Sequence, residues 1–594
     1  MSILQALVGH YDRLVANDKA PEYGYSFEAV SFGIVLSRNG EVVDVLDLRD
    51  TSGKTPRPSR RLVPRPAIRA ANVVSNFLWD KTAYVLGVKS DRNSKTPIPA
   101  QRGEHADFRQ LHLRLLAGTD DSGLNALLAF LEKWNVEDFG NLARANDMLD
   151  TNIVFRFDGD RRFIHERPAA RHVWQDHLAA QDQAEGHCLV TGELGPVQRL
   201  HPKIKGVKGA QSSGASLVSF NLGAFESFGR RQGNNAPISE QAVFAYTTTL
   251  NTLLARASSR NIQIGDATTV FWAEAAGVEA EAEAAEDLFS ILAEPEVPTD
   301  AEEAVKVADK LSAVADGRPL ADVQPGVNEN TRFFVLGLAP NAARLSVRFW
   351  YEGSIGSIAR RIGEHWRDMR LEPSPWTTPP AVWRLLLETA AQRRSANIPP
   401  ALGGALMRAI LTGGRYPHSL LAALVARMRA DKDINGRRVA ICKGCLARDY
   451  RLGFEEEDVP MSLNPDEKNV AYRLGRLFAV YESVQRAALG NVNTTIKDRY
   501  FGAASATPAS VFPLLERSSA NHLASLRKSE KGGLAHWFDR EIDLIVSGLD
   551  TDFPRSLRLE EQGRFAIGYH HQRATRRVAS DRDSEGGDTG IDED

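Results

Sequence analysis

The sequence has 594 residues, of which 43% are hydrophobic and 25% are charged, and its formal net charge is −3. This length is too great for one core, so roughly two to four domains are expected. No apolar run is long enough to span a bilayer, the N-terminus lacks a signal-peptide pattern, and the chain has three cysteines, so we expect a soluble, cytoplasmic protein without membrane association.

The first part of the chain mixes helices and strands. An amphipathic helix is predicted over about residues 2–17, and the Asn39-Gly40 pair between two β-prone runs predicts a hairpin. Helical periodicity follows over 109–150, and the segment NIVFRFDG predicts a strand.

Residues 51–110 hold 12 Lys and Arg against 4 Asp and Glu, with four prolines between 56 and 66. Within them, NVVSNFLWDKTAYVLGVK (72–89) has a strand-like apolar run from Thr82 to Val88 behind a polar, aromatic stretch. Two interpretations stay open for this stretch. Asn76 caps a turn and Trp79 belongs to the core, or the polar residues bind a polyanion.

The second basic zone is glycine-rich and covers residues 186–237. From Pro196 to Asn235 it contains six basic residues and a single acidic one, Glu226. Glycines allow a backbone to approach a ligand closely and to offer its N–H groups. We therefore expect a nucleic-acid surface here, because a glycine-rich setting gives lysines little packing reason to cluster.

Acidic segments separate the remaining parts. Residues 274–303 contain eleven Asp and Glu and no Lys or Arg, which predicts a solvated helix and linker. After it, residues 332–354 predict two strands joined around Pro340-Asn341, and the chain is mostly helical from about 355. A basic helix–loop segment covers 403–449 and includes Arg427, Arg429, Lys432, Arg437, Arg438 and Lys443.

The last part predicts a basic helical bundle over 461–570. In VAYRLGRLFAVYESVQRAAL the apolar side chains share one arc of a helical wheel, while Arg473, Arg476 and Arg486 fall on the opposite arc. Residues 468–531 hold ten basic and four acidic residues, so this outer surface is expected to be basic. The acidic tail is expected to be disordered.

The predicted fold class is α+β. A mixed α/β N-terminal region with short β-sheets precedes a mostly helical region and a C-terminal helical bundle. The predicted domains are 1–275 (α+β, binding DNA), 276–330 (acidic helix and linker), 331–458 (middle α+β to helical domain), 461–580 (bundle) and 581–594 (disordered acidic tail).

No catalytic motif is convincing. SGKT at 52–55 lacks the glycine that a phosphate-binding loop needs at position 48, and neither GxSxG nor HExxH occurs. Cys442 and Cys445 have half the spacing of a zinc site, but the other cysteine is the remote Cys188, so a pair of reduced thiols on a helix is favoured. We expect a non-enzymatic protein without cofactor or metal; the alternative is a metal-dependent nuclease or nucleic-acid-processing enzyme, and a third reading is a pure protein scaffold.

Several long, ordered stretches of the sequence are similar to a known family. They are ILQALVGHYDRL, SNFLWDKTAYVLG, TGELGPVQRLHPKIKGVKGAQSSGASLVSFN, ESFGRRQGNNAPISEQAVFAYTTTLN, FFVLGLAPNAARLSVRFW, YRLGRLFAVYESVQRAALGNVNTTIKDRYFGAASATPASVFP and LEEQGRFAIGYHHQR. By these stretches the chain resembles the large subunit of the type I-C CRISPR surveillance complex (Cascade), from the first helix to near residue 573.

The resemblance implies a subunit that recognises the PAM, a short motif in duplex DNA, while guide-RNA pairing reads the target sequence. The implied roles are to start strand separation and R-loop formation, to stabilise the displaced strand and to help recruit a helicase–nuclease. The implied partners are the CRISPR RNA ribonucleoprotein with its backbone and handle-binding subunits, small subunits, and the target DNA.

Two sets of polar residues are the candidate DNA-binding groups, since Asn and Gln can read base edges and Lys and Arg contact phosphates. The PAM-proximal set is Asn72, Asn76, Lys81, Lys203, Lys205, Lys208, Gln211, Asn234 and Asn235. The bundle set, for the displaced strand, is Arg473, Arg476, Arg486 and Lys497.

Met461 is a candidate internal start of translation. Glu455, Glu456 and Glu457 are encoded by purine-rich codons that resemble a ribosome-binding site, three codons before Met461. A start there would produce a small subunit of 134 residues, 461–594. The resembled family makes its small subunit from within this gene; the other interpretation is an ordinary methionine in a linker.

Overall fold

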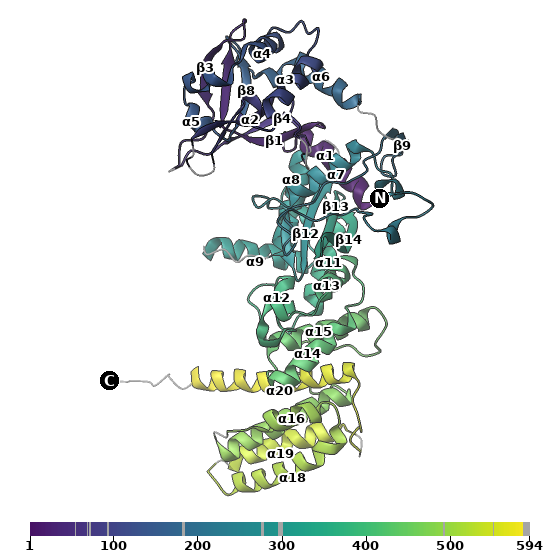
Figure 1. Cartoon of the computed structure of the whole chain (residues 1–594). Helices are drawn as coiled ribbons and strands as arrows, with labels where there is room; N and C mark the ends of the chain where they lie inside the picture. Colours follow the sequence, from purple (N-terminus) through teal and green to yellow (C-terminus); the bar gives the residue numbers. More distant parts are fainter. Residues whose placement is uncertain are drawn as a thin grey trace, which may run out of the picture. The chain divides into compact units, whose positions relative to one another are not determined.

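The computed structural model describes residues 1–594 except 54, 68, 70–72, 92–93, 95, 181–184, 275–277, 295–300, 491–492, 531, 550–551 and 586–594. Two compact units form (Figure 1). Unit 1 comprises residues 1–202 and 219–249, and unit 2 comprises residues 203–218 and 250–594. The predicted α+β class is confirmed, because strands are concentrated before residue 355 and helices dominate after it.

Unit 1 is built on a four-stranded sheet of order β3-β2-β8-β5, in which β2 and β8 run parallel. The predicted hairpin is confirmed: β2 and β3 pair antiparallel on either side of Asn39-Gly40. Phe108, Leu127 and Phe130, from α3 and α4, pack in the same buried cluster as Phe32 and Phe155 of the sheet. The elements of unit 1 are α1 (Ile3–Ala16), β1 (Tyr25–Val30), β2 (Phe32–Leu36), β3 (Val42–Asp47), β4 (Ser59–Pro64), β5 (Trp79–Lys81), α2 (Thr82–Val85), β6 (Val88–Ser90), β7 (Pro97–Pro99), α3 (Glu104–Leu115), α4 (Ser122–Lys133), α5 (Ala145–Met148), β8 (Asn152–Phe157), α6 (Pro168–Ala179), β9 (Glu185–His187), β10 (Leu194–Pro196), and most of α7 (Glu240–Leu253).

The strand expected from Thr82 to Val88 is wrong, because Thr82–Val85 form the short helix α2. The Thr82 hydroxyl donates a hydrogen bond to the Met148 carbonyl, and Leu86 N–H closes the helical turn on Thr82 O at 2.8 Å. These contacts override the β-propensity of the run, which is sensitive to context.

Unit 2 combines an antiparallel sheet with helices. The sheet order is β11-β12-β13-β14, and the predicted hairpin of 332–354 is confirmed as β13 and β14. Phe271, Phe333 and Phe349 of the sheet share a core with Phe289 of α8 and Ile358 of α11. The elements are β11 (Asn261–Ile264), β12 (Ala267–Glu274), α8 (Glu279–Ala293), α9 (Ala301–Ala315), α10 (Leu320–Val323), β13 (Arg332–Asn341), β14 (Arg344–Ser354), α11 (Ile355–Asp368), α12 (Val382–Leu387), α13 (Leu402–Thr412), α14 (His418–Asp431), α15 (Gly436–Arg451), α16 (Val470–Leu489), α17 (Ile496–Ala504), α18 (Pro508–Arg527), α19 (Gly532–Val546) and α20 (Leu559–Glu585).

The acidic segment is not a solvated linker throughout. Helix α8 forms as predicted, but Leu288, Phe289 and Leu292 are buried in the unit 2 core. Most of its acidic residues alternate with alanines, and the buried Glu286 forms an ion pair with Arg260 at 2.8 Å. Of the expected tail, residues 581–585 belong to the end of α20, and residues 586–594 lie outside the described residues. The limits of the proposed domains stay a prediction.

Candidate nucleic-acid interface

The polar stretch before β5 is a buried turn. Asn76 is 4% exposed, and its side-chain oxygen accepts a hydrogen bond from Ala67 N–H at 3.0 Å. Its own N–H donates to the Asp80 carboxylate at 2.8 Å. Burial raises the pKa of Asp80, against the opposing effects of Asn76 and of the ion pair with Arg69. Asn76 is therefore a turn residue, and its assignment as a DNA-reaching group is wrong.

The other residues of this stretch separate into core and surface. Trp79 is 2% exposed and its indole N–H donates to Pro64 O at 2.8 Å, so its assignment to the core is confirmed. Lys81 is exposed at the start of α2 and remains a candidate DNA-binding residue. Asn72 lies outside the described residues.

Residues 203–216 of unit 2 form a closed loop that we call the lysine arch. Ile204 and Ala215 exchange both backbone hydrogen bonds at 2.9 Å and are fully buried. Gly206 and Gly214 have φ values of +91° and +89°, and a Cβ at either position would lie within 2.7 Å of a backbone carbonyl oxygen. The arch therefore needs its glycines, which the sequence signalled by their density.

The backbone of the arch is also fixed to its surroundings in unit 2. Lys205 N–H donates to the Asn251 side-chain oxygen at 2.8 Å, and Lys208 N–H donates to the Thr268 hydroxyl at 3.0 Å. Ser216 continues beside β14, where its N–H donates to Ala343 O at 3.0 Å. The lysine backbones are thus held in place while their side chains extend into solvent.

The charges of the arch are available to a ligand. Lys203, Lys205, Lys208 and Gln211 are all exposed. Lys203 Nζ donates to the Ser213 hydroxyl at 3.3 Å, and within the described ranges no acidic side chain pairs with any of the three ammonium groups. A cluster of unpaired cations on a fixed backbone matches the needs of phosphate binding.

Asn235 of unit 1 organises the backbone and does not reach outward. Its side-chain oxygen accepts from Ser227 N–H at 3.0 Å, and its amide nitrogen donates to Arg230 O at 2.9 Å and Gln232 O at 3.0 Å. An amide so occupied cannot read a base edge in this conformation, so that role is corrected. Asn234, by contrast, is exposed, and so are Arg230 and Arg231, which belong to the basic zone but not to the predicted PAM-proximal set.

Two of the bundle arginines are structural. Arg476 is 3% exposed and donates from Nε to Gln572 Oε1 at 2.9 Å and from Nη1 to Pro465 O at 2.9 Å. Burial lowers its pKa. Arg473 is 9% exposed and donates to the carbonyls of Glu467 and Ile545. Their assignment to a DNA surface is wrong because α16 is enclosed on both arcs by its neighbouring helices.

Arg486 and Lys497 are less buried, although the Lys497 side chain is only 21% exposed and lies 3.8 Å from Asp498. Arg486 is half-exposed and pairs with Glu482 at 2.9 Å. Lys497 lines a cavity of about 590 Å³ together with His570 and Arg573 of α20 and Asp433. His570 and Arg573 are not among the predicted bundle residues, although the motif HHQR contains both.

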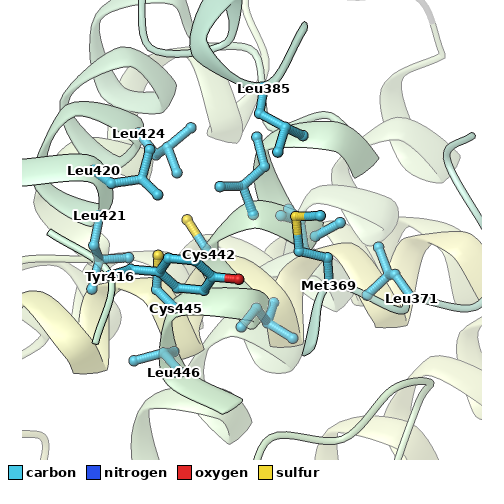
Figure 2. Close-up of a cluster of buried hydrophobic side chains, with 14 of the residues drawn as sticks. Met369, Leu371, Leu385, Tyr416, Leu420, Leu421, Leu424, Cys442, Cys445 and Leu446 are labelled. Carbon is cyan, nitrogen blue, oxygen red and sulfur yellow. The ribbon is translucent and has the colours of Figure 1, made fainter. Parts of the chain in front are cut away.

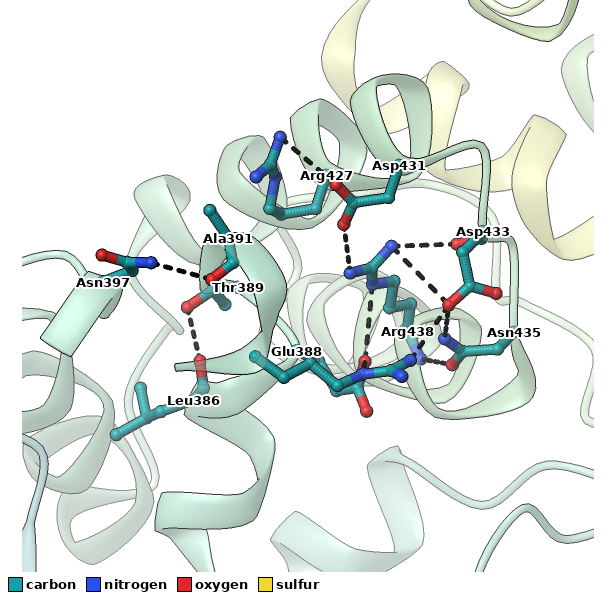
Figure 3. A network of polar contacts seen from close by, with 11 residues as sticks. Leu386, Glu388, Thr389, Ala391, Asn397, Arg427, Asp431, Asp433, Asn435 and Arg438 are labelled. Carbon is teal, nitrogen blue, oxygen red and sulfur yellow. Dashed lines mark hydrogen bonds and ion pairs between the residues drawn. The ribbon is translucent and has the colours of Figure 1, made fainter. Parts of the chain in front are cut away.

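The basic segment 403–449 is also partly internal. Arg438 is 2% exposed and bonds to Asp431 at 2.6 Å, with Glu388 at 3.4 Å from its Nε (Figure 3). Lys443 is 7% exposed, and burial lowers its pKa. Charge counts along a helix therefore overestimate its basic surface when acids are supplied by other elements.

The cysteine pair lies in an apolar environment. Cys442 and Cys445 on α15 are surrounded by Met369, Leu420 and Leu424 (Figure 2), and burial raises the pKa of Cys442 to about 12. Within the described ranges no group of three or more His, Cys, Asp or Glu side chains is placed to hold a metal ion. The arrangement fits reduced thiols that fill a core.

Met461 lies in the segment that connects α15 to α16 in unit 2. Its carbonyl accepts from Glu372 N–H at 2.9 Å. Just before it, Arg564 of α20 donates to Asp458 O at 2.9 Å and to Glu457 O, and Arg564 is 3% exposed. Leu421 and Leu446 contact the position of Gly563 on the same helix. Helix α20 thus joins the bundle to α14, α15 and the preceding linker.

Comparison with known families places these features in context. The model of one family, described as CRISPR-associated protein (Cas_Csd1), matches residues 7–577. No curated protein matches the chain. Among the described residues, no helix combines the length and the apolar character required to cross a membrane.

Proposed function

The chain belongs to this Csd1 family of CRISPR-associated proteins, and from that premise we propose that it is the large subunit of a type I-C Cascade. In this role it recognises the PAM in duplex DNA and nucleates strand separation, while guide RNA reads the target. It acts beside the CRISPR RNA ribonucleoprotein with its backbone and handle-binding subunits, in the cytoplasm, and helps to recruit the helicase–nuclease.

The lysine arch is the observation that carries the DNA-binding part of the proposal. Three exposed ammonium groups project from a backbone that is fixed by Ile204, Ala215 and two constrained glycines. Such a group holds phosphates in register, while base reading falls to other polar side chains. Lys81, Gln211 and Asn234 are the exposed candidates of the PAM-proximal set.

The C-terminal bundle is proposed to contact the displaced strand through Arg486, Lys497 and the cavity that Lys497 shares with His570 and Arg573. A basic groove that follows the nucleic-acid backbone is typical of single-strand binding. The chain itself is proposed to be non-catalytic. The family match gives no support to a nuclease.

A library of duplexes tests the proposal. The assembled complex, with guide RNA, is incubated with duplexes whose target is fixed and whose flanking bases are randomised. The proposal predicts that bound duplexes share a short flanking motif and that the complex alone does not cut them in Mg²⁺. Unenriched flanks would favour a pure scaffold, and metal-stimulated cleavage by the chain would favour the nuclease.

A separate small subunit of residues 461–594 forms part of the proposal. Such a polypeptide would lack Glu457 and Asp458, whose carbonyls accept hydrogen bonds from Arg564 in the full chain. Its α20 would therefore expose a face that the full chain covers. Replacing the Met461 codon with a non-start codon should remove a small second band from the purified complex, and persistence of that band refutes the internal start.

A further inference from the structure

One turn in unit 1 displays an aromatic side chain in an unusual backbone conformation. Ser227 and Arg230 form an antiparallel bridge, and Arg230 N–H donates to Ser227 O at 3.0 Å. The two residues between them, Phe228 and Gly229, have φ values of 52° and 70°. Positive φ at both central positions is the pattern of a type I′ turn, which favours Asn, Asp or Gly. Phenylalanine at the first of these positions is a strained choice.

The side chain of this strained residue is also almost completely exposed. Phe228 is 96% exposed, whereas Phe225 nearby is 36% exposed. An isolated exposed apolar residue is ordinary on a protein surface. An exposed aromatic ring that is held in a conformation disfavoured by its own Cβ requires a further explanation, because no packing inside unit 1 is gained by it.

The surrounding loop holds this turn in place. The Asn235 side chain bonds to the backbone on both sides of the turn, at Ser227 N–H and at Arg230 O. Gly233 packs against Gln198, where a Cβ would lie 2.5 Å from the carbonyl oxygen. The ring is therefore presented from a fixed base, which reduces the entropy that a ligand must remove on binding.

The basic side chains around the turn indicate which kind of ligand the ring would bind. Arg230 and Arg231 are exposed, and within the described ranges neither has an acidic partner. Glu226 is the only acidic residue between 219 and 235. A flat apolar ring beside two free guanidinium groups matches a nucleotide, which offers a base for stacking and a phosphate for the cations.

We propose that Phe228 stacks on a nucleic-acid base that has lost its own stacking partner, with Arg230 and Arg231 on the adjacent phosphates. This assignment rests on the proposed function and names a further contact for it. Such a base becomes available where the two DNA strands separate, so the contact stabilises the opened state and not the closed duplex.

The Phe228→Asn variant tests this proposal in the assembled complex. Asparagine suits the turn, so the variant should be at least as thermostable as the native protein. Removal of one base stack should weaken binding to the target duplex by about 5- to 150-fold. Because the change removes no charge, the dependence of affinity on salt should stay the same. Phe228→Trp, which keeps an aromatic face, should retain most of the affinity.

The readout is a target with 2-aminopurine at the base pairs next to the flanking motif, whose fluorescence reports unstacking. The native complex should quench the freed base by stacking, and Phe228→Asn should leave it bright. Unchanged affinity and quenching would overturn the proposal, as would failure of the variant to assemble, which would indicate a protein contact. If neither Phe228→Asn nor loss of the arch lysines alters binding, the proposed function itself fails; if only the lysine changes do, this inference alone fails.

Discussion

Ile204 and Ala215 exchange both backbone hydrogen bonds at 2.9 Å, and this pair closes the arch from which Lys205 and Lys208 project. The two residues are fully buried, so the lysine side chains project from a backbone that is fixed in unit 2. The arrangement separates two tasks in one short segment. Apolar side chains and glycines fix the backbone, and the lysines between them contact the ligand.

Gly214→Ala should open this arch. A Cβ at position 214 would lie 2.7 Å from Ile204 O, so the Ile204–Ala215 pair must separate. We expect faster tryptic cleavage after Lys205 and Lys208 and weaker binding of the complex to target duplex. Gly118→Ala is the matched control, because Gly118 has φ +77° but nothing within 4 Å of an added Cβ. Equal cleavage and binding in the two variants would show that the arch does not depend on this closure.

Arg476→Ala should destabilise the bundle. The substitution leaves Gln572 and two backbone carbonyls without their buried donor, and each acceptor that stays unsatisfied costs about 1–3 kcal/mol. Arg527→Ala removes only a part-exposed surface pair with Asp539 and should cost less than about 1 kcal/mol. Chemical denaturation of the full chain measures both. Similar small losses would contradict the burial of Arg476.

Acid should weaken unit 1 through His112. Its Nε2 accepts a hydrogen bond from Leu78 N–H at 2.8 Å, and burial lowers its pKa to about 4. The unfolded chain binds this proton near the ordinary pKa of about 6.5, so stability is complete above that value and falls as the pH decreases toward 4.

His112→Gln isolates this contribution. The difference in unfolding free energy between native protein and variant should narrow by about 2 kcal/mol between pH 6.5 and pH 5. Tryptophan fluorescence during denaturation measures it, because Trp79 and Trp174 are buried in unit 1. A constant difference across this range would show that His112 is not held neutral.

Secondary-structure elements could be predicted from the sequence more reliably than the roles of charged and polar residues. Asn39-Gly40 and the run 332–354 predicted hairpins correctly because turn chemistry and alternation are local. Arg473 and Arg476 share a polar arc on one helix, but the neighbouring helices that bury this arc come from distant parts of the chain. Asn76 and Asn235 likewise look like base-reading amides until their backbone partners are known.

Phe228, in contrast, is a proposed contact residue that was not predicted from the sequence. Its exposure and positive φ arise from tertiary fixing of the loop by Asn235 and Gly233, which no local pattern reports. The only local signal was the Phe228-Gly229 pair followed by two arginines in a glycine-rich segment.

The salt dependence of DNA binding by the complex that carries Lys203→Ala, Lys205→Ala and Lys208→Ala tests the central claim most directly. The matched control removes the same charge from the exposed Lys19, Lys133 and Lys306. If the arch contacts phosphates, the arch variant binds target duplex more weakly, and its slope of log affinity against log salt becomes shallower by roughly 2–3, while the control keeps the native slope. An arch variant with native affinity and native slope would contradict the account.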